Sequence, residues 1–181
     1  MKKLTFGLLA VCGILSAQEI QGFYFGLAPA YLTYESKGVK PKFHTVGEKY
    51  TLGYTIKSYG IYTASIEASI LLAGSDKKAS VTNSYGTFKN AEVTIDQLYS
   101  LHLKNQFSFG NKFNGSFYIG ATRGKIYSTS NRSVSPKKFE NSFSYGAGIE
   151  YKLNPQVYIQ ANYMQYYKNL SSVEVGFVLK F

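Results

Sequence analysis

The chain has 181 residues, enough for one domain, and combines 17 Tyr and 13 Phe with no Trp and a charged fraction of only 17%. This composition is unusual for a soluble protein and suits a membrane β-barrel, which spreads apolar residues over its outside and places aromatic side chains at both membrane interfaces. The net charge of +10 could suggest a nucleic-acid partner, but we exclude that class because the chain has no nucleic-acid-binding motif and starts with a secretion signal.

The N-terminus has the organisation of a secretory signal peptide. Lys2 and Lys3 precede an apolar run over residues 4–15, which is too short to cross a bilayer as a helix. We therefore expect a signal peptide over residues 1–17 and a mature domain over residues 18–181. No later stretch reaches the length of a transmembrane helix, which excludes a helical membrane protein.

Cys12 is the single cysteine, and two interpretations of it remain open. In one, the chain is a lipoprotein that is cleaved before Cys12. In the other, Cys12 is an ordinary residue of the apolar run and leaves with the signal peptide. The mature chain then has no cysteine and needs no disulfide bond in the oxidising periplasm.

Alternation of apolar and polar residues with a period of two predicts a series of strands along the rest of the chain. We expect eight, an even number that fits an all-β fold: a transmembrane antiparallel up-and-down β-barrel. With both termini in the periplasm, the polar connections 35–49 and 74–91 lie outside the cell, and Val81 and Phe88 suggest strand extensions there. The expected strands cover residues 23–32, 50–56, 62–72, 93–104, 116–130, 143–152, 157–164 and 172–181.

Two of these strands contain residues that conflict with a regular lipid-facing wall. Pro29 removes one ladder hydrogen bond from the first strand, so we expect a bulge or weakened pairing there. In the fifth strand, Arg123 and Lys125 face lipid if Phe117 and Ile119 do, at a cost of about 2–4 kcal/mol for each charge near mid-bilayer. Either both cations lie near the outer rim, or a bulge changes which residues face outward.

The C-terminal segment alternates strictly and stops on an aromatic residue. Val175, Phe177 and Phe181 fall on one side of an extended chain, and Glu174 and Gly176 fall on the other. This ending resembles the sorting signal that the outer-membrane barrel-assembly machinery reads, so that machinery is an expected partner during biogenesis. The residues of the expected signal are Glu174, Gly176, Leu179 and Phe181.

In layout the chain resembles the small OmpA-like family of outer-membrane β-barrels from Gram-negative bacteria. The likeness is carried by residues 22–27, by residues 146–155 and by the C-terminal signal. It implies an eight-stranded barrel whose lumen is filled by a network of acidic and basic side chains. Glu150 matches an acid of the family, whereas Gln160 stands where the family has a basic partner, so the network would differ here.

The same resemblance gives Glu67 an inward place in the third strand. Counting from the periplasmic turns puts Glu67 level with His102 to Lys104, and we expect it to pair with one of these two, because an inward carboxylate without a partner is costly. The expected lumen network therefore consists of Glu67, His102, Lys104 and Glu150. A soluble lipocalin-like barrel is the competing fold, and it would point its apolar residues inward.

These features predict a non-enzymatic outer-membrane barrel with a role in envelope integrity or surface interaction, without cofactor or metal. Its outer connections are net basic, which suits contact with phosphate-rich lipopolysaccharide, the expected partner beside the membrane itself. An adhesin-like protein that binds anionic host glycans or matrix is the sharper alternative. The basic residues of the connections are Lys37, Lys40, Lys42, Lys77, Lys78, Lys89, Arg132, Lys137, Lys138 and Lys168.

A further alternative is an outer-membrane enzyme that modifies lipid A. His44 lies in the first outer connection, and Ser75 and Asp76 start the second. Because these connections are neighbours in the expected barrel, a His/Ser/Asp constellation is geometrically feasible. No surrounding motif supports it.

Overall fold

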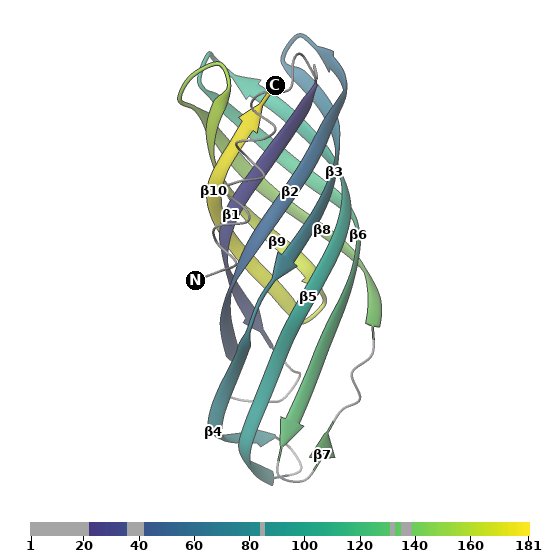
Figure 1. Cartoon of the computed structure of the whole chain (residues 1–181), viewed down its shortest axis with the longest axis vertical. Coiled ribbons are helices and arrows are strands. Elements are labelled where there is room, and N and C mark those ends of the chain that lie inside the picture. Colours follow the sequence, from purple (N-terminus) through teal and green to yellow (C-terminus); the bar gives the residue numbers. More distant parts are fainter. Residues whose placement is uncertain (1–21, 36–41, 84–85, 131–132, 135–138) are drawn as a thin grey trace.

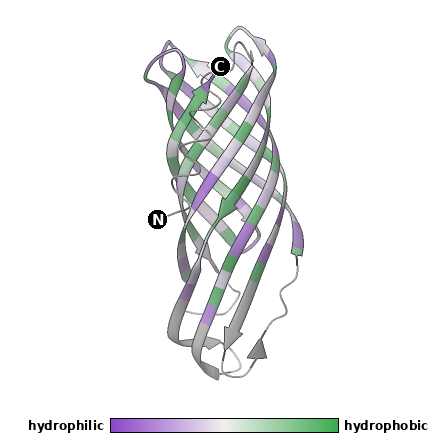
Figure 2. Ribbon diagram, in the orientation of Figure 1, coloured by the Kyte–Doolittle hydropathy of each residue, from purple (hydrophilic) through white to green (hydrophobic). Residues whose placement is uncertain are grey.

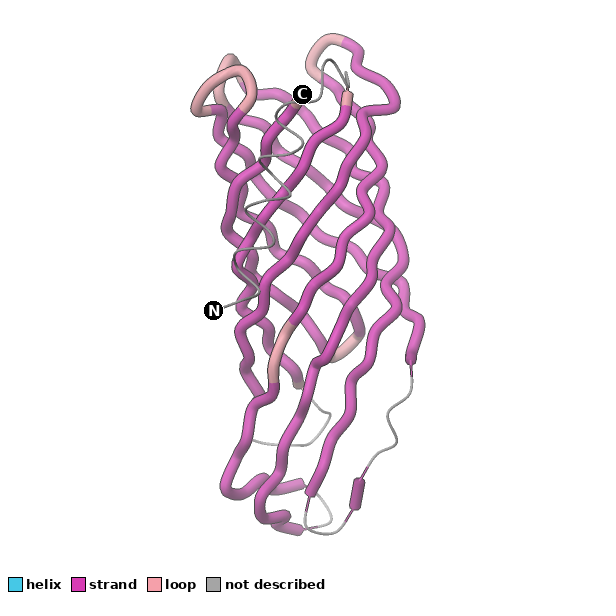
Figure 3. The backbone as a smooth tube through the Cα atoms, in the orientation of Figure 1, coloured by secondary structure: helices cyan, strands magenta, loops and turns pink. Residues whose placement is uncertain are grey.

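The computed structural model describes residues 22–35, 42–83, 86–130, 133–134 and 139–181 (Figure 1). The expected signal peptide and Cys12 lie outside these residues. The described chain consists of strands and the turns that join them (Figure 3). Within it, no helix is long and apolar enough to cross a membrane.

Ten strands form one antiparallel sheet, and eight of them close into a barrel. The strands are β1 (Phe23–Tyr34), β2 (Phe43–Tyr59), β3 (Tyr62–Leu72), β4 (Ser75–Asn83), β5 (Gly86–Phe109), β6 (Phe113–Ser130), β7 (Ser133–Val134), β8 (Phe139–Lys152), β9 (Val157–Tyr167) and β10 (Leu170–Lys180). Around the barrel the order is β1, β2, β3, β5, β6, β8, β9, β10, and β10 pairs with β1. Closure gives each of these eight strands two neighbours, so the predicted closed antiparallel barrel is confirmed.

β4 and β7 lengthen the barrel at one end and do not widen the ring. β4 continues the line of β3 along β5, and β7 continues the line of β8 along β6. Figure 1 shows β4, β5, β6 and β7 projecting together beyond the other strands. The predicted strand extension is confirmed, because Val81 pairs with Phe88.

The two ends of the barrel differ in their connections. Short turns at residues 60–61, 110–112 and 153–156 lie at the end where the Gly22 amide donates to the Phe181 carbonyl. The projecting strands lie at the opposite end (Figure 1). In outer-membrane barrels short turns face the periplasm and longer connections face outward, so we call these the periplasmic end and the outer end.

β2 starts earlier than its sequence pattern predicts. We expect a loop over residues 35–49, but the chain from Phe43 to Lys49 pairs with β1 residue by residue. The polar composition of this segment indicates a loop, yet a ladder of backbone hydrogen bonds needs only a neighbouring strand. As a result Lys49 lies on the inner face of the barrel, where it is buried.

Pro29 weakens one strand pairing without producing a bulge. β1 pairs with β2 in unbroken register through Pro29, which lies opposite Glu48. Between β1 and β10 the pairing stops after Leu27 and resumes at Ala30 in the same register. This is the result expected when a residue without an amide hydrogen interrupts a ladder.

Arg123 and Lys125 lie on the outer face of the barrel near its outer end. The pairing of β6 with β8 has no register shift from Phe113 to Lys125, so a bulge does not explain the two cations. Lys125 is the last residue of β6 that pairs with β8, and its partner is Phe139. The Arg123 guanidinium and the Lys125 ammonium lie 4.9 and 4.6 Å from the centre of the Phe139 ring. Of the two explanations for these cations, the position near the outer rim is therefore the correct one.

Large apolar side chains cover the outside of the closed part of the barrel. Leu52, Leu101, Ile149, Val175 and Phe177 are each more than half exposed. Figure 2 shows hydrophobic positions alternating with polar ones along the strands. A soluble lipocalin-like barrel would bury these residues, so that competing fold is wrong.

Candidate functional site in the lumen

A group of buried ions crosses the lumen in its periplasmic half. The Lys104 ammonium lies 3.2 Å from Glu67 Oε1 and also donates to Glu150 Oε1. The other oxygen of Glu150 accepts from Lys180 at 3.0 Å, and the Tyr24 hydroxyl donates to Glu67 at 2.9 Å. These residues come from β1, β3, β5, β8 and β10, so the group ties together strands from all around the ring. We call it the inner ion network.

A second group lies nearer the outer end and is centred on Glu174. Lys49 Nζ donates to Glu174 Oε2 at 2.8 Å, and the hydroxyls of Tyr166 and Ser172 both donate to Oε1. Glu174 is 0% exposed and Lys49 is 3% exposed. Because one cation and two hydroxyls compensate one anion, the carboxylate is satisfied without water.

Hydroxyl groups occupy the wall beside these ions. His102 Nε2 and Ser144 Oγ lie 2.9 Å apart, Thr122 donates to Ser144 at 2.9 Å, and Ser100 lies 2.8 Å from Thr122. His102 is the cross-strand neighbour of Glu67, yet its ring contacts Ser144 on the far side of β6. In the described chain, every fully buried side-chain nitrogen or oxygen has a hydrogen-bond partner.

Apolar side chains fill the lumen on the outer side of Glu174. Leu32, Leu98, Met164, Tyr166 and Leu170 are all 0% exposed and belong to one packed cluster. Close-packed cores leave few voids larger than a water molecule. The outer half of the lumen is therefore filled by these apolar side chains, which we call the apolar plug. The alternation of apolar and polar residues in the sequence does not predict it, because there the inward positions are expected to be polar.

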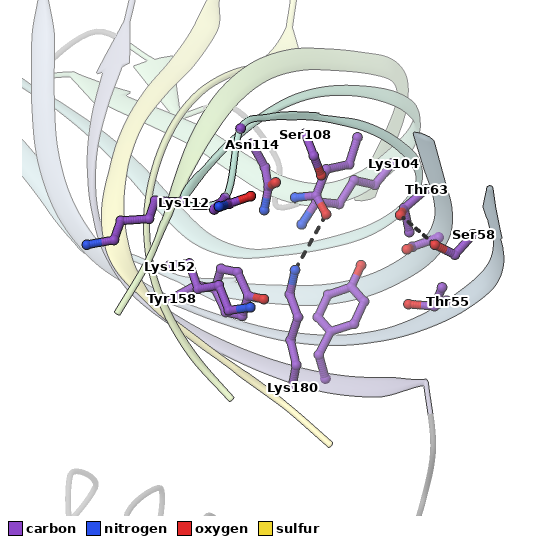
Figure 4. Close-up of a pocket in the computed structure, with 15 residues that line it drawn as sticks. Thr55, Ser58, Thr63, Lys104, Ser108, Lys112, Asn114, Lys152, Tyr158 and Lys180 are labelled. Atoms are coloured by element: carbon purple, nitrogen blue, oxygen red, sulfur yellow. Dashed lines mark hydrogen bonds between the residues drawn. The ribbon is translucent and has the colours of Figure 1, made fainter. Parts of the chain in front are cut away.

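At the periplasmic end the lumen opens into a cavity of about 390 Å³ (Figure 4). Tyr24, Lys104 and Lys180 of the inner ion network form part of its wall, together with Lys152. The cavity thus ends at the inner ion network and does not reach the outer end. We call it the periplasmic vestibule.

The structure brings together Glu67, Lys104 and Glu150 of the expected network and places His102 in the hydroxyl group beside it. Sequence reasoning missed Lys49 and Lys180. Lys180 could have been found, since it shares the inner face of the last strand with Glu174 by the period of two. Lys49 could not, because the pattern indicates a loop there.

The residues of the expected assembly signal divide between the two faces of β10. Glu174 and Gly176 face the lumen and are buried, whereas Leu179 and Phe181 lie among the partly exposed residues of the outer face. A Cβ atom on Gly176 would lie 2.0 Å from the Leu27 carbonyl oxygen of β1. Glycine is therefore required where β10 closes against β1.

His44 and Asp76 are neighbours at the outer end. The backbone amide of His44 donates to Asp76 Oδ2 at 2.8 Å, while His44 Nδ1 lies 3.3 Å from the Thr33 hydroxyl. The His44 ring stacks on Tyr31 with centroids 5.4 Å apart. Asp76 thus contacts the main chain of His44, whereas a carboxylate that activates a catalytic histidine contacts its ring. Ser75 starts β4 and pairs with Thr94.

Few of the basic residues of the outer connections fall on described side chains. Lys42 forms an ion pair with Glu35 at the surface, and Lys168 is exposed. The side chains of the other eight lie outside the described part of the chain. The described chain also contains no group of three or more His, Cys, Asp or Glu that could hold a metal ion.

Comparison with known proteins places this geometry in a family. A family profile described as "Outer membrane protein beta-barrel domain" matches residues 4–181. A search of curated proteins found no match.

Solved structures of outer-membrane barrels share the fold. Ail of Yersinia pestis, in complex with the heparin analogue sucrose octasulfate, is 17% identical with a TM-score of 0.58, covering 90% of this chain and 100% of that chain. Neisserial surface protein A is 17% identical with a TM-score of 0.52, covering 91% and 100%. The N-terminal barrel domain of OprF from Pseudomonas aeruginosa is 14% identical with a TM-score of 0.52, covering 89% and 98%. The chain belongs to the outer membrane protein β-barrel domain family and is a small transmembrane barrel of the bacterial outer membrane.

Proposed function

We propose that this barrel is a non-conducting, non-enzymatic component of the outer membrane that contributes to envelope integrity. The observation that carries the proposal is the filled lumen. The inner ion network, the Glu174 group and the apolar plug follow one another from the periplasmic vestibule to the outer end. An eight-stranded barrel has an interior just wide enough for such side chains, so solutes have no continuous path.

The outer wall supports a contact with lipopolysaccharide. Arg123 and Lys125 lie at the outer rim of β6, above the exposed apolar residues Ile119 and Phe143 on the same wall. A lipid with phosphate groups above acyl chains presents the complementary order of charge and hydrocarbon. Arginine and lysine form charge-assisted hydrogen bonds with phosphate, which favours this partner.

The test is the permeability of the envelope in a strain that lacks the protein. We expect the deletion strain to become sensitive to bile salts and hydrophobic antibiotics, and the wild-type chain to restore resistance. The double variant Arg123→Gln/Lys125→Gln restores it only in part. A matched control, Lys57→Gln/Lys112→Gln, removes two exposed cations at the periplasmic end and restores it fully. Unchanged permeability in the deletion strain contradicts the proposal.

The second candidate is an adhesin-like role in binding anionic host glycans or matrix. The strands β4 and β5 project beyond the closed barrel and carry Lys77, Lys78 and Lys89, and the similar barrel Ail was crystallised with a heparin analogue. Retention of intact cells on immobilised heparin tests it. Replacing these three lysines with Gln abolishes retention if the candidate is right, and unchanged retention excludes this surface.

A further inference from the structure

The periplasmic vestibule lies outside the filled part of the lumen, and the charged residues of its wall are all cations. Four lysines line it, and its lining contains no Asp or Glu. The rest of the wall consists mainly of hydroxyl and amide side chains, such as Ser58, Thr63 and Asn114, from several strands (Figure 4). These groups supply hydrogen-bond donors without adding negative charge.

The lysines of the vestibule differ in how they are compensated. Lys104 is paired with Glu67 and Glu150, and Lys180 is paired with Glu150. Lys152 has no carboxylate within ion-pair distance among the described residues. Three inward-facing lysines therefore meet two carboxylates, so the vestibule carries an excess positive charge.

Lys152 faces the cavity because every second residue of a strand points to the same side of the sheet. It lies two residues after the inward-facing Glu150 on β8 and pairs across to Tyr158, another residue of the vestibule wall. The Lys180 ammonium lies 4.0 Å from the centre of the Tyr158 ring. Tyr158 is thus the cross-strand neighbour of Lys152, and its ring lies against the Lys180 ammonium. Lys112 also belongs to the lining, but its ammonium group lies over the ring of Tyr151 at 5.9 Å.

We propose that the periplasmic vestibule binds a phosphate group, held between the ammonium groups of Lys152 and Lys180. A phosphate near neutral pH carries a charge of about −1.5 to −2. Lys152 offers it an uncompensated ammonium, Lys180 offers a second ammonium that is shared with Glu150, and the hydroxyl groups of the wall offer further donors. Glu150 does not repel the ligand, because two lysines already neutralise it. The closed floor at Lys104 means that the ligand enters and leaves from the periplasm.

The phosphate can come from free inorganic phosphate or from a small phosphomonoester. A volume of about 390 Å³ lies within the range of small-molecule sites and leaves room for an organic part beside the phosphate. Two probes separate the sources. The folded full-length barrel in a neutral detergent is titrated with inorganic phosphate and with glycerol 3-phosphate, with glycerol as the uncharged control, and binding is followed by isothermal titration calorimetry.

We expect saturable binding of at least one phosphate probe and none of glycerol. Tighter binding of glycerol 3-phosphate identifies a phosphomonoester as the ligand, and equal binding identifies free phosphate. The absence of saturable binding of both probes overturns the proposal.

Two variants, each lacking one lysine charge, distinguish binding at a specific site from a general electrostatic attraction of phosphate to the barrel. Lys152→Gln removes a cation that faces the cavity and weakens binding by about tenfold or more, since a hydrogen bond to a charged group contributes roughly 1.5–3 kcal/mol. Lys57→Gln removes the same charge at the same end of the barrel from an exposed side chain that is not part of the cavity lining, and it leaves binding nearly unchanged. Neither lysine belongs to the buried ion groups, and heat-dependent gel migration verifies that both variants fold. An equal loss in both variants shows diffuse electrostatics and also overturns the proposal.

Discussion

At the scale of single residues, the buried charges of this barrel occur in compensated groups. Lys49 opposes Glu174, and Lys104 and Lys180 oppose Glu67 and Glu150. Removing one member of such a group leaves its buried partner charged without its counterion. Removing both members avoids that cost and is far better tolerated.

The Glu174 group gives the clearest stability test. Lys49→Met leaves Glu174 with only hydroxyl donors, and we expect the free energy of unfolding to fall by about 3–5 kcal/mol. The double variant Lys49→Met/Glu174→Gln recovers most of this loss, because no uncompensated charge remains. Urea unfolding in detergent micelles, followed by circular dichroism, measures both. An equal loss in the single and double variants would show that packing, and not charge, controls the site.

The residues that point into the lumen could be predicted from the sequence wherever the alternation of apolar and polar residues was clear. The period of two gives Glu67, Lys104 and Glu150 their direction, and the turn count gives Glu67 its level. The choice between His102 and Lys104 as its partner depends on what lies across the lumen. There Ser144 contacts His102, and a single strand pattern carries no information about such a contact.

At the scale of elements, β10 combines closure of the barrel with the expected assembly signal. β10 pairs with β1 and so closes the ring, and the amide of Phe181, directly after β10, donates to the Phe23 carbonyl of β1 at 3.0 Å. Phe177 lies on the same outer face four residues earlier. Replacing Phe181 or Phe177 removes the same side chain from two positions on one face, so the comparison tests whether the position of the aromatic residue matters.

We propose that the barrel-assembly machinery reads Phe181, and we therefore predict that Phe181→Ala lowers the amount of folded protein in the outer membrane several-fold. Phe177→Ala removes the same side chain from the middle of the same strand face and has a smaller effect. Immunoblots of outer-membrane fractions, with and without boiling, measure the folded amount. Equal levels for the two variants would contradict a terminal signal.

The outer extension is a separate unit of structure. β3 pairs with β5 over Tyr62–Leu72 and closes the ring there, below the segment where β4 joins β5. Replacing residues 78–91 with a two-residue Asn-Gly turn between the paired residues Lys77 and Glu92 should therefore leave a folded barrel that still migrates differently when unboiled. Loss of that migration difference would show that the extension is needed for closure.

The extent of the outer strands could not be predicted from the sequence, although their number could. Lipid-facing apolar residues mark a strand only where it crosses hydrocarbon. Above the membrane, β2 and β4 continue with polar residues on both faces, as at His44 and Asp76, and the alternating signal disappears. The apolar plug was missed for a related reason, since Leu98 and Met164 point inward, where the barrel pattern leads one to expect polar residues.

At the scale of the whole molecule, the order of features along the barrel axis supports an anchored, closed protein. The periplasmic vestibule is open, the middle of the lumen is ionic, the outer half is apolar, and strands project outward. An apolar belt surrounds the closed part, with Arg123 and Lys125 at its outer rim. This order is the basis for our proposal that the barrel is a fixed surface in the membrane without an open channel.

Export provides one prediction at this scale. We propose that residues 1–17 are a signal peptide and that residues 18–181 are the mature domain. N-terminal sequencing of the protein from outer membranes should then start at or within a few residues of Gln18. Incorporation of labelled palmitate, with a start at Cys12, would establish the lipoprotein interpretation instead.

The most direct test of the filled lumen is electrical. The folded protein, verified by its shift in gel migration on boiling, is inserted into planar lipid bilayers and recorded over a range of voltages. The buried ion groups and the apolar plug predict a membrane current no higher than that of the bare bilayer. Reproducible discrete conductance steps from the folded protein would contradict the account.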